Sequence, residues 1–260
     1  MLASIDGVLV DAASATISVL DDGLLRGDGV FEVIRVYEGR PFALDEHLER
    51  MARSAASLRL ALDLEAIRAD VDALLAEGGP NDAALRLVGT RGGRRIALLE
   101  PLRIFPETIA LATITYSPTR LLDGVKSLSY GANMLATRLA KEAGAEEALL
   151  VSPHGRVLEG PTTSFFYVLG GELCTPPLSD RILDSISRRV LLAVTDARER
   201  VTTRADLDAI SEAFLASSLR EVMAVRSIDG RAIEAAPGPV AIEAAERVRE
   251  HIEAALAPPA

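Results

Sequence analysis

Hydrophobic positions in the first third of the chain follow a strand-like spacing and then a helix-like one. Residues 29–37 are rich in β-branched and aromatic side chains, and the turn sequence Glu38-Gly39-Arg40-Pro41 that follows is typical of a β-hairpin. The next apolar positions recur every three or four residues, which predicts two helices. Their buried stripes are expected to be Leu44, Leu48, Met51, Ala55 and Leu58 in one helix and Ile67, Val71 and Leu74 in the other.

Strand-like and helix-like patterns also alternate through the rest of the chain. Strands are expected over 84–115, apart from the loop 90–95, and at 125–129, 148–152, 156–158 and 165–169. Helices are expected over 133–142 and from near Ser185 and Pro239, and the last should bury Ile242, Ala245, Val248, Ile252 and Leu256. A proline-bearing polar turn at 117–120 indicates a boundary. The pattern therefore predicts an α+β chain with domains over 1–116 and 122–260 and a linker at 117–121.

Composition and charge narrow the class of protein. The chain has 260 residues, 49% of them hydrophobic, and a net charge of −10, so it can form a substantial core but has no overall attraction for nucleic acid or anionic membranes. One cysteine and three scattered histidines argue against a disulfide framework and a metal site. No apolar run approaches the roughly 20 residues of a membrane span, and the first residues include no basic leader. We therefore expect a soluble cytoplasmic protein that binds a small molecule.

Candidate chemistry begins with Lys126, a single lysine in the strand-like apolar segment 125–130. A lysine on an edge strand can simply point into water, but one removed from water can act as a nucleophile toward carbonyl groups. Glu159 follows some thirty residues later, at the end of a strand and before a polar loop of small residues. These two residues alone leave both interpretations open.

Two hydroxyl-rich turns follow, at 183–188 and 215–220. Turns of this kind can direct backbone N–H groups and hydroxyls toward an anion, above all at a helix N-terminus. Ser187 is equally explained as a helix cap, and Ser217 and Ser218 as an ordinary turn. An anion site at these turns is therefore one of two interpretations.

Taken in order, these segments resemble the class IV aminotransferases, which are pyridoxal 5'-phosphate (PLP) enzymes of fold type IV. The family includes branched-chain aminotransferases, D-amino-acid aminotransferases and aminodeoxychorismate lyases. The resemblance runs from about Asp21 to Gly230, and two further motifs that carry it are residues 26–33 and 46–55. It implies a smaller N-terminal α/β domain, a larger C-terminal PLP-binding domain with a barrel-like β core, and a homodimer.

The resemblance also implies a role for each matching residue. Lys126 would form the internal aldimine with PLP and move a proton between the substrate Cα and the cofactor C4′. Glu159 would keep the pyridine nitrogen protonated, and Leu183 would lie against one face of the ring. The cofactor phosphate would be bound by Arg50, Ile186, Ser187, Ser217 and Ser218.

The substrate is less closely defined by the resemblance. Two aromatic residues are expected to bind the substrate, Phe31 and Tyr130. Phe31 stands where D-amino-acid enzymes usually carry tyrosine, and Tyr130 stands one position before the tyrosine of branched-chain enzymes. The loop 90–95 contains three arginines and a glycine pair, so Arg94 or Arg95 is expected to bind a substrate carboxylate, unless the loop is a solvated hairpin tip. The sequence thus predicts amino-group transfer between an α-amino acid, of D-amino-acid or branched-chain type, and a 2-oxo acid. The alternative is an aminodeoxychorismate lyase that releases pyruvate and 4-aminobenzoate.

Overall fold

The computed structural model describes residues 1–257, and the chain divides into two compact units. Among the described residues, unit 1 consists of Met1–Ile104, Val125–Tyr130 and 255–257, and unit 2 consists of Phe105–Gly124 and Gly131–Ala254. These limits differ from the expected 1–116 and 122–260. The strand over Thr108–Thr115 pairs with strands of unit 2, while the segment that carries Lys126 pairs with a strand of unit 1.

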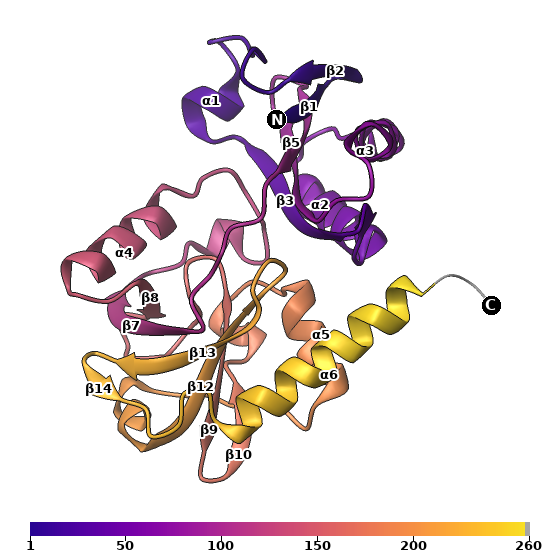
Figure 1. Cartoon of the computed structure of the whole chain (residues 1–260). Coiled ribbons are helices and arrows are strands. Elements are labelled where there is room, and N and C mark those ends of the chain that lie inside the picture. Colours follow the sequence, from indigo (N-terminus) through magenta and orange to yellow (C-terminus); the bar gives the residue numbers. More distant parts are fainter. Residues whose placement is uncertain (258–260) are drawn as a thin grey trace. The chain divides into compact units, whose positions relative to one another are not determined.

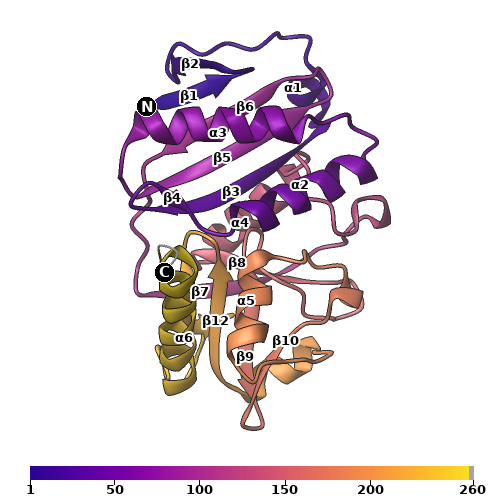
Figure 2. The same ribbon diagram turned by 90° about the vertical axis from the view of Figure 1, so that its right-hand side faces the viewer.

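Unit 1 is built on an antiparallel sheet with helices on one face. Within residues 1–257 its sheet has six strands in the order β2-β1-β6-β5-β3-β4. The strands are β1 (Leu2–Ile5), β2 (Val8–Asp11), β3 (Gly29–Tyr37), β4 (Arg40–Pro41), β5 (Ala83–Thr90) and β6 (Arg95–Glu100). The helices are α1 (Asp22–Arg26), α2 (Leu44–Ser57) and α3 (Leu64–Gly78). Figure 2 shows α2 and α3 lying across the same face of the sheet.

The core of unit 1 lies between this sheet and the two longer helices. Because side chains alternate along a strand, Val30, Ile34 and Val36 of β3 point toward α2, and Phe31 points to the opposite face. Met51 of α2 and Val71 of α3 are completely buried against the strand residues. The predicted hairpin and both predicted helices are therefore confirmed, including the apolar stripes that cover the sheet.

Unit 2 contains a larger sheet, drawn in Figure 1 from magenta to yellow. Among the described residues it has eight strands in the order β11-β10-β9-β12-β13-β7-β8, with β14 paired to β13. These are β7 (Thr108–Thr115), β8 (Glu147–Val151), β9 (Ser164–Leu169), β10 (Glu172–Thr175), β11 (Arg198–Glu199), β12 (Ile210–Ser217), β13 (Glu221–Ile228) and β14 (Arg231–Ala232). The helices are α4 (Gly131–Glu142), α5 (Ile186–Val194) and α6 (Pro239–Leu256), with 3-10 turns at Arg120–Leu122, Leu178–Asp180 and Arg204–Ala209.

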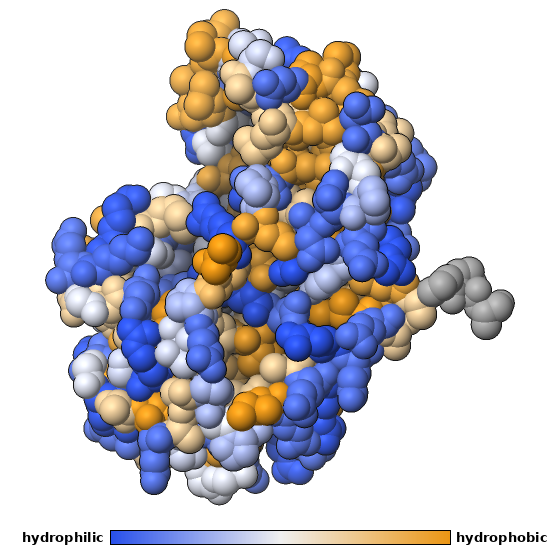
Figure 3. Space-filling model, in the orientation of Figure 1, coloured by the Kyte–Doolittle hydropathy of each residue, from blue (hydrophilic) through white to orange (hydrophobic). Residues whose placement is uncertain are grey.

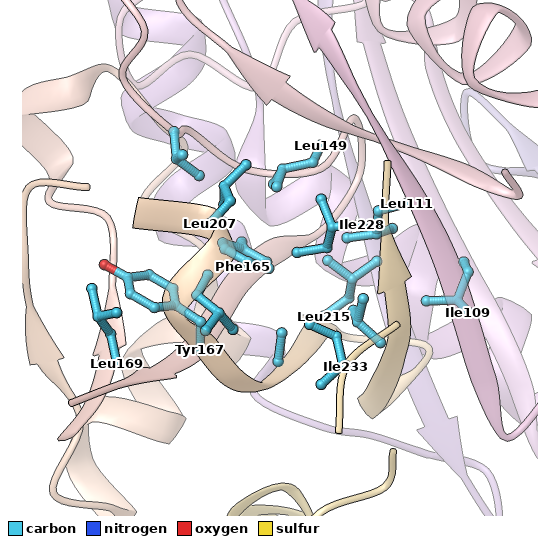
Figure 4. Close-up of a cluster of buried hydrophobic side chains, with 14 of the residues drawn as sticks. Ile109, Leu111, Leu149, Phe165, Tyr167, Leu169, Leu207, Leu215, Ile228 and Ile233 are labelled. Atoms are coloured by element: carbon cyan, nitrogen blue, oxygen red, sulfur yellow. The ribbon is translucent and has the colours of Figure 1, made fainter. Parts of the chain in front are cut away.

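The two ends of this sheet are linked by single bridges. Val157 bridges to Val151 at the end of β8, and Arg156 bridges to Thr203, shortly after β11. The sheet therefore curls into a barrel-like form, and its interior is filled by the apolar cluster in Figure 4, where Phe165, Leu215 and Leu111 come from β9, β12 and β7. The resemblance implied such a core in the C-terminal domain.

Three local expectations differ from the structure. Residues 125–129 and 156–158 form isolated bridges in place of full strands, because each runs beside its partner for only a short distance. On α6 the buried residues are Ala241, Ala244, Val248 and Ile252, whereas Ile242 is 46% exposed. Small alanines let this helix approach its neighbours closely, which the spacing of large side chains did not reveal. No helix in residues 1–257 is both long and apolar enough to cross a membrane.

Candidate active site

Lys126 of unit 1 is held beside the start of β3. Its carbonyl accepts a hydrogen bond from the Phe31 N–H at 3.1 Å, and the Leu128 N–H donates to the Gly29 carbonyl at 2.9 Å. The Lys126 Nζ lies 4.6 Å from the centroid of the Phe31 ring and 5.9 Å from that of Tyr130. The two rings meet edge to face, with centroids 5.1 Å apart. The structure thus brings Lys126 together with both aromatic residues predicted to contact substrate.

The backbone of Lys126 is also attached to α2. Its N–H donates to the Ser54 hydroxyl at 3.1 Å, and Ser54 is fully buried on that helix. The position of the lysine is therefore determined by a strand on one side and a helix on the other, neither of which adjoins it in sequence. Such support favours a single orientation of the amine.

A buried charged cluster joins β3 to α2. The Glu32 carboxylate accepts hydrogen bonds from Arg50 Nε at 2.8 Å, from Arg50 Nη2 at 2.6 Å and from His47 Nδ1 at 2.8 Å. All three side chains are at most 5% exposed. Arg50, the predicted phosphate ligand, thus has its guanidinium orientation fixed by a carboxylate on the neighbouring strand.

The ionisation of this cluster follows from burial and pairing. Burial by itself raises the pKa of Glu32, but the hydrogen bonds from Arg50 and His47 outweigh it and lower the pKa to about 2. Burial lowers the pKa of His47, and the opposing effect of Glu32 does not restore it. At neutral pH His47 is therefore neutral and donates its Nδ1 proton to a charged carboxylate.

Sequence reasoning did not single out Glu32 or His47 as part of the site. A signal was present, because Glu32 is the lone carboxylate within the apolar run 29–37. A charged residue in a buried strand needs a partner. The partners lie on the next helix, where Arg50 and His47 share one face at a spacing of three residues.

The arginine-rich loop of unit 1 is exposed at Arg91, Gly92 and Gly93, and each of its three arginines pairs with a different carboxylate. Arg91 Nε lies 3.0 Å from Asp28, Arg94 pairs with Asp6, and Arg95 Nε lies 3.1 Å from Asp70 of α3. Because α3 covers the face of the sheet opposite to Phe31, Arg95 points away from the Lys126 amine. Within unit 1, therefore, Arg95 is not brought together with Lys126.

The remaining predicted residues gather at one edge of the sheet in unit 2. Glu159 Oε1 accepts a hydrogen bond from the Leu183 N–H at 3.0 Å, which joins the segment after Leu158 to the one before α5. Burial and the neighbouring Glu159 carboxylate raise the pKa of Tyr116. The Glu159 carboxylate is thus oriented by the Leu183 N–H and lies near the Tyr116 hydroxyl.

The N-terminus of α5 lies beside the end of β12. Ser185, rather than Ser187, caps the helix, and its hydroxyl accepts a hydrogen bond from the Arg188 N–H at 3.0 Å. The Ser185 hydroxyl also lies 2.8 Å from that of Ser164, which pairs with Ala216 across the β9–β12 ladder. The first turn of α5, with Ile186 and Ser187, is therefore close to Ser217 and Ser218 at the end of β12.

This edge of unit 2 is suited to an anion and to a basic ring nitrogen. The first N–H groups of a helix have no partner within the helix and attract anions, and the hydroxyls of Ser217 and Ser218 add donors. Glu159 offers a carboxylate at the end of the same group of residues. Within residues 1–257 no group of three or more His, Cys, Asp or Glu side chains is placed to hold a metal ion.

Comparison with known protein families agrees with this arrangement. The family model described as amino-transferase class IV matches residues 29–228, from β3 to β13. The chain belongs to the class IV aminotransferase family, and its fold is that of the fold type IV aminotransferases.

Relatives within the family have more than one substrate type. A Methanocaldococcus jannaschii protein provisionally named a branched-chain-amino-acid aminotransferase is 36% identical over 88% of each chain. The D-alanine aminotransferase of Bacillus licheniformis is 31% identical, covering 90% of this chain and 91% of its own. A hypothetical aminotransferase from Mycobacterium tuberculosis, solved in a PLP-bound form, superimposes with a TM-score of 0.88 at 27% identity over 98% of this chain and 99% of its own.

The residues of this chain fit PLP, the cofactor that class IV aminotransferases use. Its phosphate matches the N–H groups at the start of α5 and the serines at the end of β12, and its ring nitrogen matches Glu159. Gly160 follows Glu159 in a confined loop, where a Cβ atom would lie 2.2 Å from the Thr163 hydroxyl. The loop after Glu159 therefore has no room for a larger residue.

Proposed function

We propose that this chain is a PLP-dependent aminotransferase that moves an amino group between an α-amino acid, of D-amino-acid or branched-chain type, and a 2-oxo acid. The observation that carries the proposal is the position of Lys126, whose backbone is hydrogen-bonded to β3 and α2 and whose amine lies beside the rings of Phe31 and Tyr130. The two substrate types are those named for the relatives.

PLP, when bound, supplies an electron-accepting ring and carries the amino group between the two halves of the reaction. In this proposal Lys126 Nζ binds the cofactor and moves a proton to and from the substrate Cα. The rings of Phe31 and Tyr130 lie beside this amine.

The other residues bind and orient. Glu159 would keep a proton on the ring nitrogen, and Leu183, whose N–H donates to that carboxylate, would contact the ring. In unit 2 the phosphate would be bound by groups at Ile186, Ser187, Ser217 and Ser218, and the family resemblance implies that the Arg50 guanidinium, which Glu32 orients, also binds it. The net charge of −10 does not oppose this binding, because these donors act locally.

The substrate would be recognised by its apolar side chain and its carboxylate. Phe31 and Tyr130 provide an apolar wall beside the Lys126 amine. Of the two arginines predicted to bind a carboxylate, Arg94 is the better candidate, because it is 42% exposed and Arg95 is directed toward α3. The lyase alternative has no structural observation of its own in its favour.

A donor panel tests the proposed function. The purified protein should absorb at roughly 410–430 nm, as PLP bound to lysine does, and the band should shift when an accepted donor is added. D-alanine, L-leucine and L-glutamate distinguish the donor types, and a 2-oxo acid should restore the original band. If none of a full set of D- and L-donors moved the band, while aminodeoxychorismate released pyruvate without an amino acceptor, the lyase would replace this proposal.

Lys126→Ala tests the role of the lysine itself. The variant should be colourless and lose nearly all transfer activity, because it lacks both the anchoring amine and the proton carrier. Lys141→Ala, on the exposed side of α4, removes a lysine outside the site and should behave as wild type. A yellow and fully active Lys126→Ala protein would exclude the role given to this lysine.

We also propose that the chain acts as a homodimer. Seven large apolar side chains within residues 1–25 are exposed: Met1, Val8, Leu9, Val19, Leu20, Leu24 and Leu25. Figure 3 shows apolar atoms gathered at the end of unit 1 that carries α1 and β2. Contiguous apolar surface of this kind is typical of a protein–protein interface.

A further inference from the structure

Glu147 is a buried carboxylate that no step above uses. It begins β8 in unit 2, and its side chain is 5% exposed. One of its oxygens, Oε2, lies 2.5 Å from Arg220 Nη1, and the other, Oε1, accepts a hydrogen bond from the Thr163 hydroxyl at 3.1 Å. The two oxygens therefore bind two different segments of the chain.

Arg220 lies in the turn between β12 and β13, two residues after Ser218. Its N–H donates to the Ser217 hydroxyl at 3.3 Å, and its guanidinium carbon lies 5.0 Å from the centroid of the Phe105 ring. The side chain is 14% exposed. The turn that carries the two serines is thus held in place by the Arg220 guanidinium, which contacts the Glu147 carboxylate and the Phe105 ring.

Thr163 belongs to the loop that follows Glu159. The Gly160 N–H donates to the Thr163 carbonyl at 2.8 Å, which closes the loop, and a Cβ on Gly160 would lie 3.1 Å from Glu147 Oε1. Asn133 of α4 donates to the Pro161 carbonyl at 2.9 Å. Glu147 therefore contacts both the loop next to Glu159 and the turn next to Ser217 and Ser218.

We propose that the Glu147–Arg220 ion pair is a positioning device for the cofactor. It sets the distance between the Ser217–Ser218 turn, at the phosphate end, and the Gly160–Thr163 loop, at the ring-nitrogen end. The inference rests on the cofactor placement proposed above. Neither residue touches the cofactor in this account; both act through the segments that they hold.

The contacts of Glu147 and Arg220 explain how the ion pair would position the two segments. A buried carboxylate with one charged and one hydroxyl partner has its rotation fixed, and the guanidinium of Arg220 has its plane fixed by Phe105. Without the Arg220 side chain the serine turn loses its contacts with Glu147 and Phe105, although the backbone N–H of residue 220 can still donate to the Ser217 hydroxyl. We expect the turn then to present its donors to a phosphate less accurately, while the Lys126 and Glu159 contacts stay in place.

Binding titrations of cofactor-free protein test the inference. PLP and pyridoxal, which lacks the phosphate, are titrated into wild type, Arg220→Met, Glu147→Gln and the double variant. Arg220→Met should weaken PLP binding about tenfold, as expected for the loss of one charge-assisted phosphate contact, and pyridoxal binding by less than about twofold. The double variant leaves no buried charge unpaired, so it should fold with a thermal midpoint close to wild type and show the same loss as Arg220→Met alone.

Two further variants make the result specific. Arg226→Met removes the exposed pair of Arg226 with Glu146, one residue before Glu147, and should bind both ligands as wild type does. The Ser217→Ala/Ser218→Ala protein measures the phosphate contact itself. If it binds PLP normally, both the cofactor placement and this inference are wrong. If it loses PLP affinity but Arg220→Met and the double variant do not, only the positioning role is wrong.

If the Glu147–Arg220 pair only stabilised the fold, the binding and thermal measurements would show a different pattern. Loss of the pair would then lower PLP and pyridoxal affinity in parallel, together with the thermal midpoint of the double variant. That outcome overturns the inference and leaves the proposed aminotransferase activity, which the donor panel measures in wild type, unaffected.

Discussion

Glu32 of unit 1 owes its charge at neutral pH to two neighbouring side chains. It lies in a strand of apolar residues and is completely buried, yet Arg50 and His47 keep it ionised. In a buried ion pair the cost of removing both charges from water nearly cancels their attraction, so the pair contributes little net free energy of folding. Removing one partner is costly, because the other charge then stays buried without a partner. Two predictions follow from this residue.

Glu32→Gln should lower the free energy of unfolding by about 3–5 kcal/mol, because the Arg50 charge stays buried without its carboxylate. Urea denaturation measures the change. The matched control is Glu100→Gln, which removes the partner of the half-exposed Arg86 and should cost about 0–1 kcal/mol. Equal effects of the two substitutions would contradict the assigned importance of the buried cluster.

Acid should destabilise the protein through the same carboxylate. A carboxyl group whose pKa is lower in the folded than in the unfolded chain stabilises the fold above the unfolded pKa, and this contribution disappears as the pH falls toward the folded pKa. For Glu32 the interval runs from 4.5 to about 2. The loss should reach about 3 kcal/mol across it.

Urea denaturation at about pH 5 and about pH 3 measures this dependence. The fall in the free energy of unfolding should be smaller in Glu32→Gln, which cannot titrate at that position. The same pH dependence in both proteins would assign the acid sensitivity to other carboxylates.

At the level of elements, α5 shows how a short helix can be positioned for function. Ser185 caps its first turn and is tied to Ser164 on β9, so the unpaired N–H groups of Ile186 and Ser187 have a fixed direction relative to the sheet. The cap of α1 is tied to a strand in the same way, because Asp21 accepts a hydrogen bond from the Thr90 hydroxyl of β5 at 2.8 Å. Asp63 caps α3 through a single hydrogen bond of 3.0 Å to the Ala66 N–H.

Ser185→Ala should therefore have two effects, where Asp63→Ala has one. Both substitutions should lower stability by about 1 kcal/mol, the usual value of an N-cap. Only Ser185→Ala should also weaken PLP binding, because it releases the proposed phosphate-binding turn. Thermal denaturation and PLP titration of the two variants make the comparison, and unchanged PLP affinity in Ser185→Ala would contradict the phosphate role of α5.

On the scale of the whole molecule, the order of the chain and the division into units do not coincide. Lys126 belongs to a short segment of unit 1, Val125–Tyr130, that is preceded and followed in sequence by residues of unit 2. The segment therefore packs with unit 1, where it contacts β3 and α2, while the residues on both sides of it belong to unit 2. The predicted domain limits placed Lys126 in the C-terminal domain, because continuity along the sequence was the only guide.

The proposed homodimer is a prediction at this scale. Replacing Leu20 and Leu24, which are 80% and 58% exposed, by glutamate should convert a dimer into a monomer, because the charges oppose burial of the apolar surface. Light scattering coupled to gel filtration gives the mass. Leu121→Glu, at a site 89% exposed in unit 2, is the control and should leave the mass unchanged. A wild-type protein with the mass of one chain would refute the proposal.

The sequence alone determined the family, most of the elements and which residue types could take part in the chemistry. Its local signals were sufficient because a hairpin turn, an apolar stripe on a helix or a lysine in an apolar segment depends on neighbours within a few positions. The order of the motifs then pointed to the class IV family, which the family comparison confirms.

Tertiary structure decided what those signals could not, because pairing between distant segments has no local signature. It attached the Lys126 segment to β3, oriented Arg50 by Glu32, and placed Ser185 beside Ser164. It also showed that Arg95 has a carboxylate partner on α3 and faces away from the lysine. Each of these depends on which strand or helix lies across from a residue, and that is set by the burial of the core as a whole.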